Sequence, residues 1–290
     1  MPGSVELIAD IGGSSSRWTL LDGAGQVTRL SSSQLPGFNP AVNSSDEFVD
    51  AIRSALRVER PIQEHITRIT VYGAGCGAEE RKLRMKEAVA AIAKSDKVVI
   101  NTDLLGAARG LCGAAPGMVV IIGTGMNAGW YDGKDLSTPM PSLGWILGDE
   151  GSGADIGKQL LSDAVHGRIP DRVMLAIFGR GTCSATEALQ FVKSEKPNSV
   201  IAALAGKLST VRSDPYVTRL LNARFTALGA LLDQYFSAHF PCSVSATGGI
   251  AHGFREELGT CLRPLGLDLH HVMPDPMEGI IAWHRAHRPH

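Results

Sequence analysis

The sequence lacks the features that mark several large classes of protein. No apolar run reaches the roughly 18 residues that a helix needs to span a bilayer. The first residues, Met1–Glu6, contain no basic segment followed by an apolar signal core. The formal net charge is −1, and no basic cluster predicts a surface for nucleic acid. We therefore expect a cytoplasmic protein that binds neither membranes nor nucleic acid.

Cysteine is scarce, and the common phosphate-binding signatures are missing. The five cysteines, Cys76, Cys112, Cys183, Cys242 and Cys261, form no Cys-x-x-Cys pair. This argues against a structural zinc site and against a disulfide framework. The chain has no Gly-x-x-x-x-Gly-Lys-Ser/Thr loop, and no Gly-x-Gly-x-x-Gly lies between a first strand and a helix. A bound nucleotide would therefore need another kind of loop.

What the sequence does contain is an alternation of apolar strand-like segments with helical ones. The 290 residues are enough for one large domain or two, and the alternation predicts an α/β fold. The strand–turn–strand pattern of residues 7–21 returns at residues 117–131, which indicates an internal duplication. We expect loops at residues 35–40 and 132–143, a helix-rich region at 151–240, and one helix from about Ile250.

Three glycine-containing turns follow apolar strands, at Gly12, Gly123 and Gly248. Glycine lets a backbone approach a phosphate closely, and such turns offer amide N–H groups and hydroxyls. Asp10 ends the first strand, where a carboxylate can hold magnesium through water. One such turn would fit an ordinary hairpin. Three at comparable positions indicate a nucleotide held between two related halves.

Two acidic residues either carry chemistry or cap helices. Asp103 stands where a strand gives way to a helix, so it can orient an attacking hydroxyl in phosphoryl transfer or serve as an N-cap. Asp149 lies with Trp145 in the glycine-rich segment Gly144–Gly153. A carboxylate there can accept hydrogen bonds from sugar hydroxyls, and an indole can line a pocket. Asp149 or Ser152 could instead cap the next helix, and the residue types leave both interpretations open.

Together these motifs resemble the N-acetylglucosamine kinase branch of the BadF/BadG/BcrA/BcrD-type ATPases, in the actin-like, sugar kinase and Hsp70 ATPase superfamily. The similarity covers nearly the whole chain and lies in residues 10–14, 37–40, 72–76, 101–107, 123–127, 144–145, 147–152 and 246–251. It implies an α/β, two-domain actin-like ATPase (ribonuclease H-like) fold, with a duplicated βββαβαβα core and a nucleotide cleft between domains. The implied domains are residues 1–115, against which a C-terminal helix at 276–290 packs back, and residues 116–275.

The resemblance also implies a role for each matching residue. Asp103 would be the general base on the 6-hydroxyl of the sugar. Sugar contacts are implied for Asn39, Asn127, Gly144, Trp145 and Asp149, of which Asn127 could reach the phosphates instead. Nucleotide contacts are implied for Asp10, Gly12, Gly13, Ser14, Ser15, Gly123, Thr124, Gly125, Gly248 and Gly249, with Asp10 holding Mg²⁺ through water. The implied activity is ATP-dependent phosphorylation of an amino sugar, with N-acetylglucosamine as the first candidate.

Several alternatives stay open at this point. A glucosamine kinase would fit the same motifs, because the apolar slot for an acetamide cannot be located in the sequence. An ATPase activator with an iron–sulfur cluster would need positioned cysteines, and Cys76 is the one cysteine near a glycine-rich turn. A sugar-responsive nucleotide switch is a third alternative. A homodimer is also left open.

Overall fold

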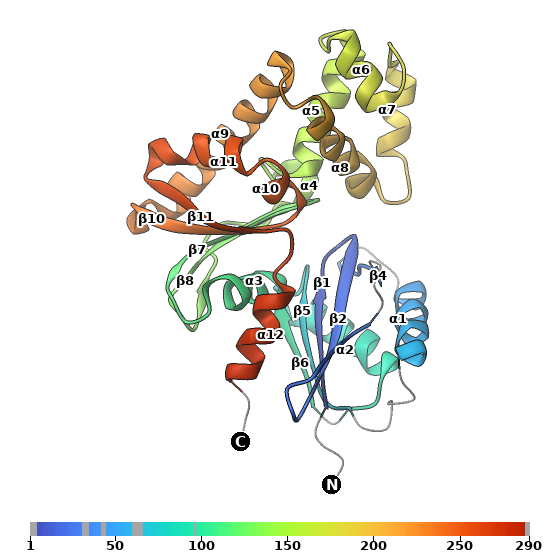
Figure 1. Ribbon diagram of the computed structural model, residues 1–290. Helices are drawn as coiled ribbons and strands as arrows, with labels where there is room; N and C mark the ends of the chain where they lie inside the picture. Colours follow the sequence, from blue (N-terminus) through green and yellow to red (C-terminus); the bar gives the residue numbers. More distant parts are fainter. Residues whose placement is uncertain (1–4, 31–34, 42–44, 60–65, 96, 288–290) are drawn as a thin grey trace. The chain divides into compact units, whose positions relative to one another are not determined.

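The computed structural model describes residues 5–30, 35–41, 45–59, 66–95 and 97–287. The chain divides into two compact units (Figure 1). Unit 1 consists of Met1–Gly113 and Pro276–His290, and unit 2 of Ala114–Asp275. Within the described ranges, no helix combines the length and the apolar character needed to cross a membrane.

Unit 1 is built on a mixed β-sheet with helices on both faces. Its strands are β1 (Val5–Ile11), β2 (Ser15–Asp22), β3 (Val27–Arg29), β4 (Leu35–Pro36), β5 (Ile66–Gly73) and β6 (Lys97–Thr102). Its helices are α1 (Asp46–Glu59), α2 (Glu79–Ile92), α3 (Asp103–Cys112) and α12 (Met277–Ala286). The strand order is β3-β2-β1-β5-β6, and β4 pairs with β2. Neighbours in β3-β2-β1 are antiparallel, whereas β1, β5 and β6 are parallel.

The central strand β1 is buried on both faces. Leu7, Ala9 and Ile11 belong to a cluster that includes apolar residues of α1 and α2. Ile8 points to the opposite face, where it joins a second cluster with Ile280 of α12. Side chains alternate between the two faces of a strand. A strand covered on both faces therefore reads as a continuous apolar run.

Unit 2 contains a second mixed sheet and most of the helices. Its strands are β7 (Gly117–Ile122), β8 (Met126–Tyr131), β9 (Leu136–Ser137), β10 (Cys242–Thr247) and β11 (Leu267–Met273). Its α-helices are α4 (Gly144–Leu147), α5 (Gly153–Val165), α6 (Asp171–Phe178), α7 (Ala185–Val192), α8 (Pro197–Lys207), α9 (Pro215–Phe236), α10 (Gly249–Gly253) and α11 (Arg255–Leu262). Its 3₁₀ turns are η2 (Leu208–Val211), η3 (Ser237–His239) and η4 (Arg263–Leu265). One large core joins β7 and β10 to α5, α8, α9 and α11.

The two sheets repeat one topology, which confirms the predicted α/β fold with a duplicated core. Sheet 2 has the order β11-β10-β7-β8-β9, the counterpart of β6-β5-β1-β2-β3 in sheet 1. In each sheet an antiparallel meander leads into parallel strands. Helix α12 follows β11 and is therefore the last element of the second repeat. It nevertheless belongs to unit 1, where it packs on α3. Residues 288–290 of the expected final helix lie outside the described residues.

Three local expectations are wrong. The expected loops at residues 35–40 and 132–143 contain the short strands β4 and β9. The single helix expected from Ile250 is divided into α10 and α11 at Phe254, whose φ of −122° and ψ of 35° depart from helical values. Phe254 is 2% exposed and belongs to the core of unit 2. Burial of its ring accompanies the break, which local sequence preference did not predict.

Candidate active site

The first glycine turn connects β1 to β2 in unit 1. The Gly12 amide donates to the Ser15 carbonyl at 2.9 Å, which closes the turn, while Gly13 and Ser14 are exposed. The segment after β4 packs directly on it, because the Phe38 amide donates to the Gly12 carbonyl at 3.1 Å. A Cβ atom added to Gly37 would lie 2.5 Å from the Ser15 nitrogen. This position therefore requires glycine, and the 35–38 segment fixes the turn.

The carboxyl ends of β1, β5 and β6 bring several expected residues of unit 1 to one edge of the sheet. Asp10 pairs with Tyr72, and Tyr72 pairs with Asn101 on the next strand, two residues before Asp103. Asn39 lies against the turn that follows β5, since a Cβ atom on Gly75 would lie 3.0 Å from the Asn39 side-chain carbon Cγ.

Asp103 is the first residue of α3, but it is not the residue that caps this helix. The cap is Thr102, whose hydroxyl accepts a hydrogen bond from the Leu105 amide at 3.2 Å. Asp103 Oδ1 accepts from the Leu104 amide at 2.8 Å. Burial raises the pKa of Asp103 to about 6, although these backbone hydrogen bonds favour the charged form. A carboxylate whose pKa is raised toward neutrality is suited to accept a proton.

Cys76 lies near this carboxyl group and is 1% exposed. Burial, and secondarily the negative charge of Asp103, raises the pKa of the Cys76 thiol to about 12. A cysteine that binds an iron–sulfur cluster must be accessible to the cluster, and the Cys76 side chain is almost completely buried. This environment disfavours the iron–sulfur alternative.

The second and third glycine turns lie together in unit 2. β7 and β10 are parallel neighbours, and Gly123 and Gly248 follow their carboxyl ends. Gly248 has φ 113°, and a Cβ atom on it would lie 2.7 Å from the carbonyl carbon of Ile122. Gly249, the next residue, is exposed and begins α10. Close backbone approach and a positive φ both require glycine at position 248.

The start of α5 is bonded to the second turn. The Gly123 amide donates to the Gly125 carbonyl at 2.9 Å, which closes the turn. The Gly153 and Ala154 amides donate to the carbonyls of Gly123 and Thr124 at 2.8 and 3.1 Å. Helix N–H groups that lack partners within the helix are thus satisfied by this turn.

Asp149 lies against the same turn. A Cβ atom on Gly125 would lie 2.8 Å from Asp149 Oδ2, and the carboxylate accepts a hydrogen bond from the Met126 amide. Asp149 has φ 61°, a strained conformation for a residue with a side chain. Burial raises its pKa to about 6. The residue that caps α5 is Ser152, whose hydroxyl accepts from the Asp155 amide at 3.2 Å.

The remaining expected sugar residues of unit 2 lie on neighbouring elements. Gly144, with φ 69°, begins α4. Trp145 follows it and packs against the core of unit 2. Asn127 is the second residue of β8, and its Oδ1 accepts from the Ala128 amide at 3.0 Å. The structure thus gathers Asp10, Asn39 and Asp103 in unit 1, and Gly123, Gly125, Asp149 and Gly248 in unit 2.

Sequence reasoning missed several residues that hold these turns. Asp155 Oδ2 accepts from the Gly151 amide at 2.9 Å and from Arg224 Nε at 2.8 Å, which fixes the segment after Asp149. No local pattern links Arg224 to that segment across 69 residues. Gly37 belongs to one of the motifs, but the sequence does not reveal its contact with the first turn.

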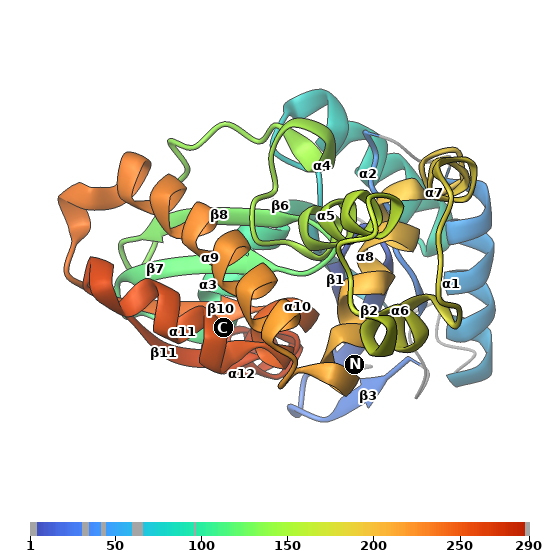
Figure 2. The ribbon, with the colours of Figure 1, turned by 90° about the horizontal axis from the view of Figure 1, so that it is seen from above.

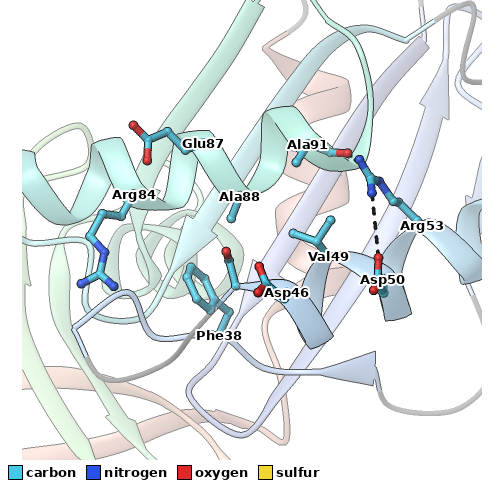
Figure 3. A pocket seen from close by; sticks show the side chains of 10 residues that line it. Phe38, Asp46, Val49, Asp50, Arg53, Arg84, Glu87, Ala88 and Ala91 are labelled. Atoms are coloured by element: carbon cyan, nitrogen blue, oxygen red, sulfur yellow. Dashed lines mark hydrogen bonds and ion pairs between the residues drawn. The ribbon is translucent and has the colours of Figure 1, made fainter.

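Two surface pockets contain none of the expected site residues. One, of about 410 Å³, lies between α1 and α2 (Figure 3). Its floor includes Phe38, Val49 and Ala88, and the Arg53 side chain lies 3.8 Å from Asp50 at its edge. The other, of about 430 Å³, lies between α11 and the edge strand β11. Within the described residues, no group of three or more His, Cys, Asp or Glu side chains could hold a metal ion.

The chain is similar to solved structures of sugar kinases. Comparisons with protein-family models and with curated proteins gave no match. A protein from Porphyromonas gingivalis proposed to be an N-acetylglucosamine kinase is 28% identical, with a TM-score of 0.84 over 98% of this chain and 99% of that one. A protein from Chromobacterium violaceum with the same proposed activity is 20% identical, with a TM-score of 0.72 over 97% and 98%.

A glucokinase of the ROK family from Streptomyces griseus, in complex with glucose and AMPPNP, shares the fold. It is 14% identical and has a TM-score of 0.57 over 99% of each chain. The Porphyromonas protein, in contrast, is similar to this chain in sequence as well as in fold, over nearly the full length of both. Together with the duplicated sheets, these similarities show that the chain has the fold of sugar kinases, and its resemblance to the Porphyromonas protein extends over nearly its whole length.

Proposed function

We propose that this sugar kinase phosphorylates an amino sugar, N-acetylglucosamine in the first place, at its 6-hydroxyl. The observation that carries the proposal is the state of Asp103: it lies at the carboxyl edge of sheet 1, the capping role belongs to Thr102, and its pKa is raised to about 6. The resemblance to two proteins proposed to be N-acetylglucosamine kinases supports the choice of sugar.

Asp103 is assigned as the general base. It accepts the proton of the sugar hydroxyl while that oxygen bonds to the terminal phosphorus of ATP and ADP leaves. Phosphoryl transfer depends mainly on positioning and charge stabilisation, with a carboxylate orienting the nucleophile. The Leu104 amide, which donates to Oδ1, fixes the carboxylate for this role.

The sugar is assigned to Asn39, Asn127, Gly144, Trp145 and Asp149. The Asp149 carboxylate accepts hydrogen bonds from sugar hydroxyls, and its contact with the Gly125 turn holds it in place. Carboxylates are effective acceptors for such hydroxyls. Trp145 offers an apolar surface together with an indole N–H donor.

The nucleotide is assigned to the glycine turns, through Asp10, Gly12, Gly13, Ser14, Ser15, Gly123, Thr124, Gly125, Gly248 and Gly249. The turns fit a phosphate chain, since Gly13 and Ser14 are exposed and added Cβ atoms at Gly13, Gly123 and Gly249 would meet no protein atom. Asp10, at the end of β1, is a suitable carboxylate for Mg²⁺ held through water. When bound, the ion would neutralise phosphate charge.

A coupled assay of ADP release tests the activity. We expect N-acetylglucosamine to give a higher kcat/KM than glucosamine or glucose. Product analysis should place the phosphate on O6. A preference for glucosamine would overturn the substrate assignment, and absence of turnover with every sugar would overturn the kinase assignment.

Calorimetry of an Asp149→Ala variant tests the sugar site separately. We expect sugar affinity to fall far more than the affinity for an ATP analogue, because Asp149 is assigned to the sugar alone. Equal losses for both ligands, or unchanged sugar affinity, would contradict the assignment.

A further inference from the structure

Helix α4 carries part of the proposed sugar site, yet little apolar burial holds it. It is a single turn, Gly144–Leu147. Ile146 and Leu147 are 68% and 73% exposed, and the preceding Leu143 is 56% exposed. Trp145 is the side chain of α4 that packs against the core of unit 2. Because an isolated helical turn is unstable in water, other contacts must keep it in place.

Figure 2 shows helix α5 beside α4, and Lys158 of α5 provides such a contact. Its Nζ donates to the Trp145 carbonyl at 2.5 Å and lies 3.5 Å from the Ile146 carbonyl. The last carbonyls of a helix lack partners within it, and a positive charge is favoured there. α5 is firmly anchored, since Ile156 and Leu160 are fully buried. Lys158 therefore connects a weakly packed turn to a rigid helix.

The hydrogen bond from Lys158 bears on two proposed sugar ligands, Trp145 within α4 and Asp149 just after it. Trp145 supplies one of the bonded carbonyls, so its backbone is fixed by Lys158. Asp149 follows α4 after Gly148, whose amide donates to the Gly144 carbonyl at 2.8 Å. The ammonium group of Lys158 also attracts the Asp149 carboxylate.

We infer that Lys158 is a positioning residue, which holds α4 so that Trp145 and Asp149 meet the sugar in the correct arrangement. The inference rests on the proposed function, because it takes Trp145 and Asp149 as sugar ligands. Lys158 itself is not assigned to the sugar or to the nucleotide. Its removal should affect sugar binding while leaving nucleotide binding intact.

The test compares Lys158→Met and Lys158→Arg with the matched control Lys207→Met. Lys207 makes the same type of bond in unit 2, from Nζ to the Ile177 carbonyl at 2.7 Å, but it bonds α6 rather than α4. Lys158→Met should raise the KM for N-acetylglucosamine roughly tenfold to a hundredfold, the range expected for a lost hydrogen bond of a charged group. The KM for ATP should be unchanged. Lys158→Arg should restore most of the affinity, and Lys207→Met should behave as wild type.

Hydrogen exchange of the free protein gives a second readout that does not need activity. Lys158→Met should speed exchange of the amides at residues 144–149, with the rest of unit 2 unchanged. A sugar KM within twofold of wild type, equal changes for sugar and ATP, or the same effect in Lys207→Met would overturn the inference. If the wild type phosphorylates no sugar, the proposed function fails. Independently of kinase activity, unchanged exchange at residues 144–149 in Lys158→Met would refute the inference that Lys158 holds α4 in place.

Discussion

Replacing Asp103 by asparagine should stabilise the protein while removing its kinase activity. The raised pKa of about 6 means that ionising this carboxyl group costs free energy in the folded protein. Asparagine is neutral and of similar shape, and its side-chain oxygen can still accept from the Leu104 amide. The variant therefore avoids the cost of the buried charge and keeps the hydrogen bond observed at 2.8 Å.

The size of the gain follows from the pKa. A rise of about two pKa units over the unfolded value corresponds to about 3 kcal/mol at neutral pH. This is an upper limit, because Asp103 as a whole residue is only partly buried. The upward direction of the Asp103 pKa shift also determines how the cost of its ionisation depends on pH. Below about pH 4 both folded and unfolded states are protonated and the cost vanishes. It grows as pH rises toward about 6 and is constant above that value.

Urea unfolding of wild type and Asp103→Asn at pH 4 and pH 7.5 measures this difference, alongside turnover with N-acetylglucosamine. We expect about 1–3 kcal/mol in favour of the variant at pH 7.5 and little difference at pH 4. Turnover should fall by about two to four orders of magnitude, as is typical when a general base is lost. Equal stability at both pH values would refute the reasoning about burial. Wild-type turnover in the variant would remove Asp103 from the mechanism.

Three further predictions concern the same elements. The kcat/KM for the sugar should decrease below about pH 6, because Asp103 must be ionised to accept a proton and Asp149 must be ionised to bind the sugar as a carboxylate, and a pH profile that is flat down to pH 5 would contradict this. Gly37→Ala should lower the melting temperature and weaken ATP binding, because its Cβ atom would lie 2.5 Å from a backbone nitrogen of the first turn. In the control Gly77→Ala the nearest atom is 3.9 Å away. Gly125→Ala should raise the KM for the sugar by displacing the Asp149 carboxylate, 2.8 Å from the added Cβ atom, and an unchanged KM would show that Asp149 does not bind the sugar in this position.

The sequence determined the class of fold and the identity of the turns. Apolar strands such as β1 and β7 are recognisable because burial on both faces requires continuous apolar runs. The glycine turns stand out because close backbone approach and positive φ exclude other residues, as at Gly248. The repeat of strand, turn and strand was visible although few residues are identical, because the same topology imposes the same apolar pattern.

Only the tertiary structure decided that Asp103 and Asp149 do not cap helices. It also revealed the residues, distant in sequence, that hold the segments around Asp149. Thr102 and Ser152 cap their helices. The sequence could not separate them from Asp103 and Asp149, because threonine, serine and aspartate can all cap a helix. The raised pKa values of Asp103 and Asp149 depend on burial, which exists only in the folded chain. The bond from Arg224 to Asp155 spans 69 residues, and that from Lys158 to Trp145 joins two helices. Neither leaves a local pattern, because such contacts exist only once the chain has folded.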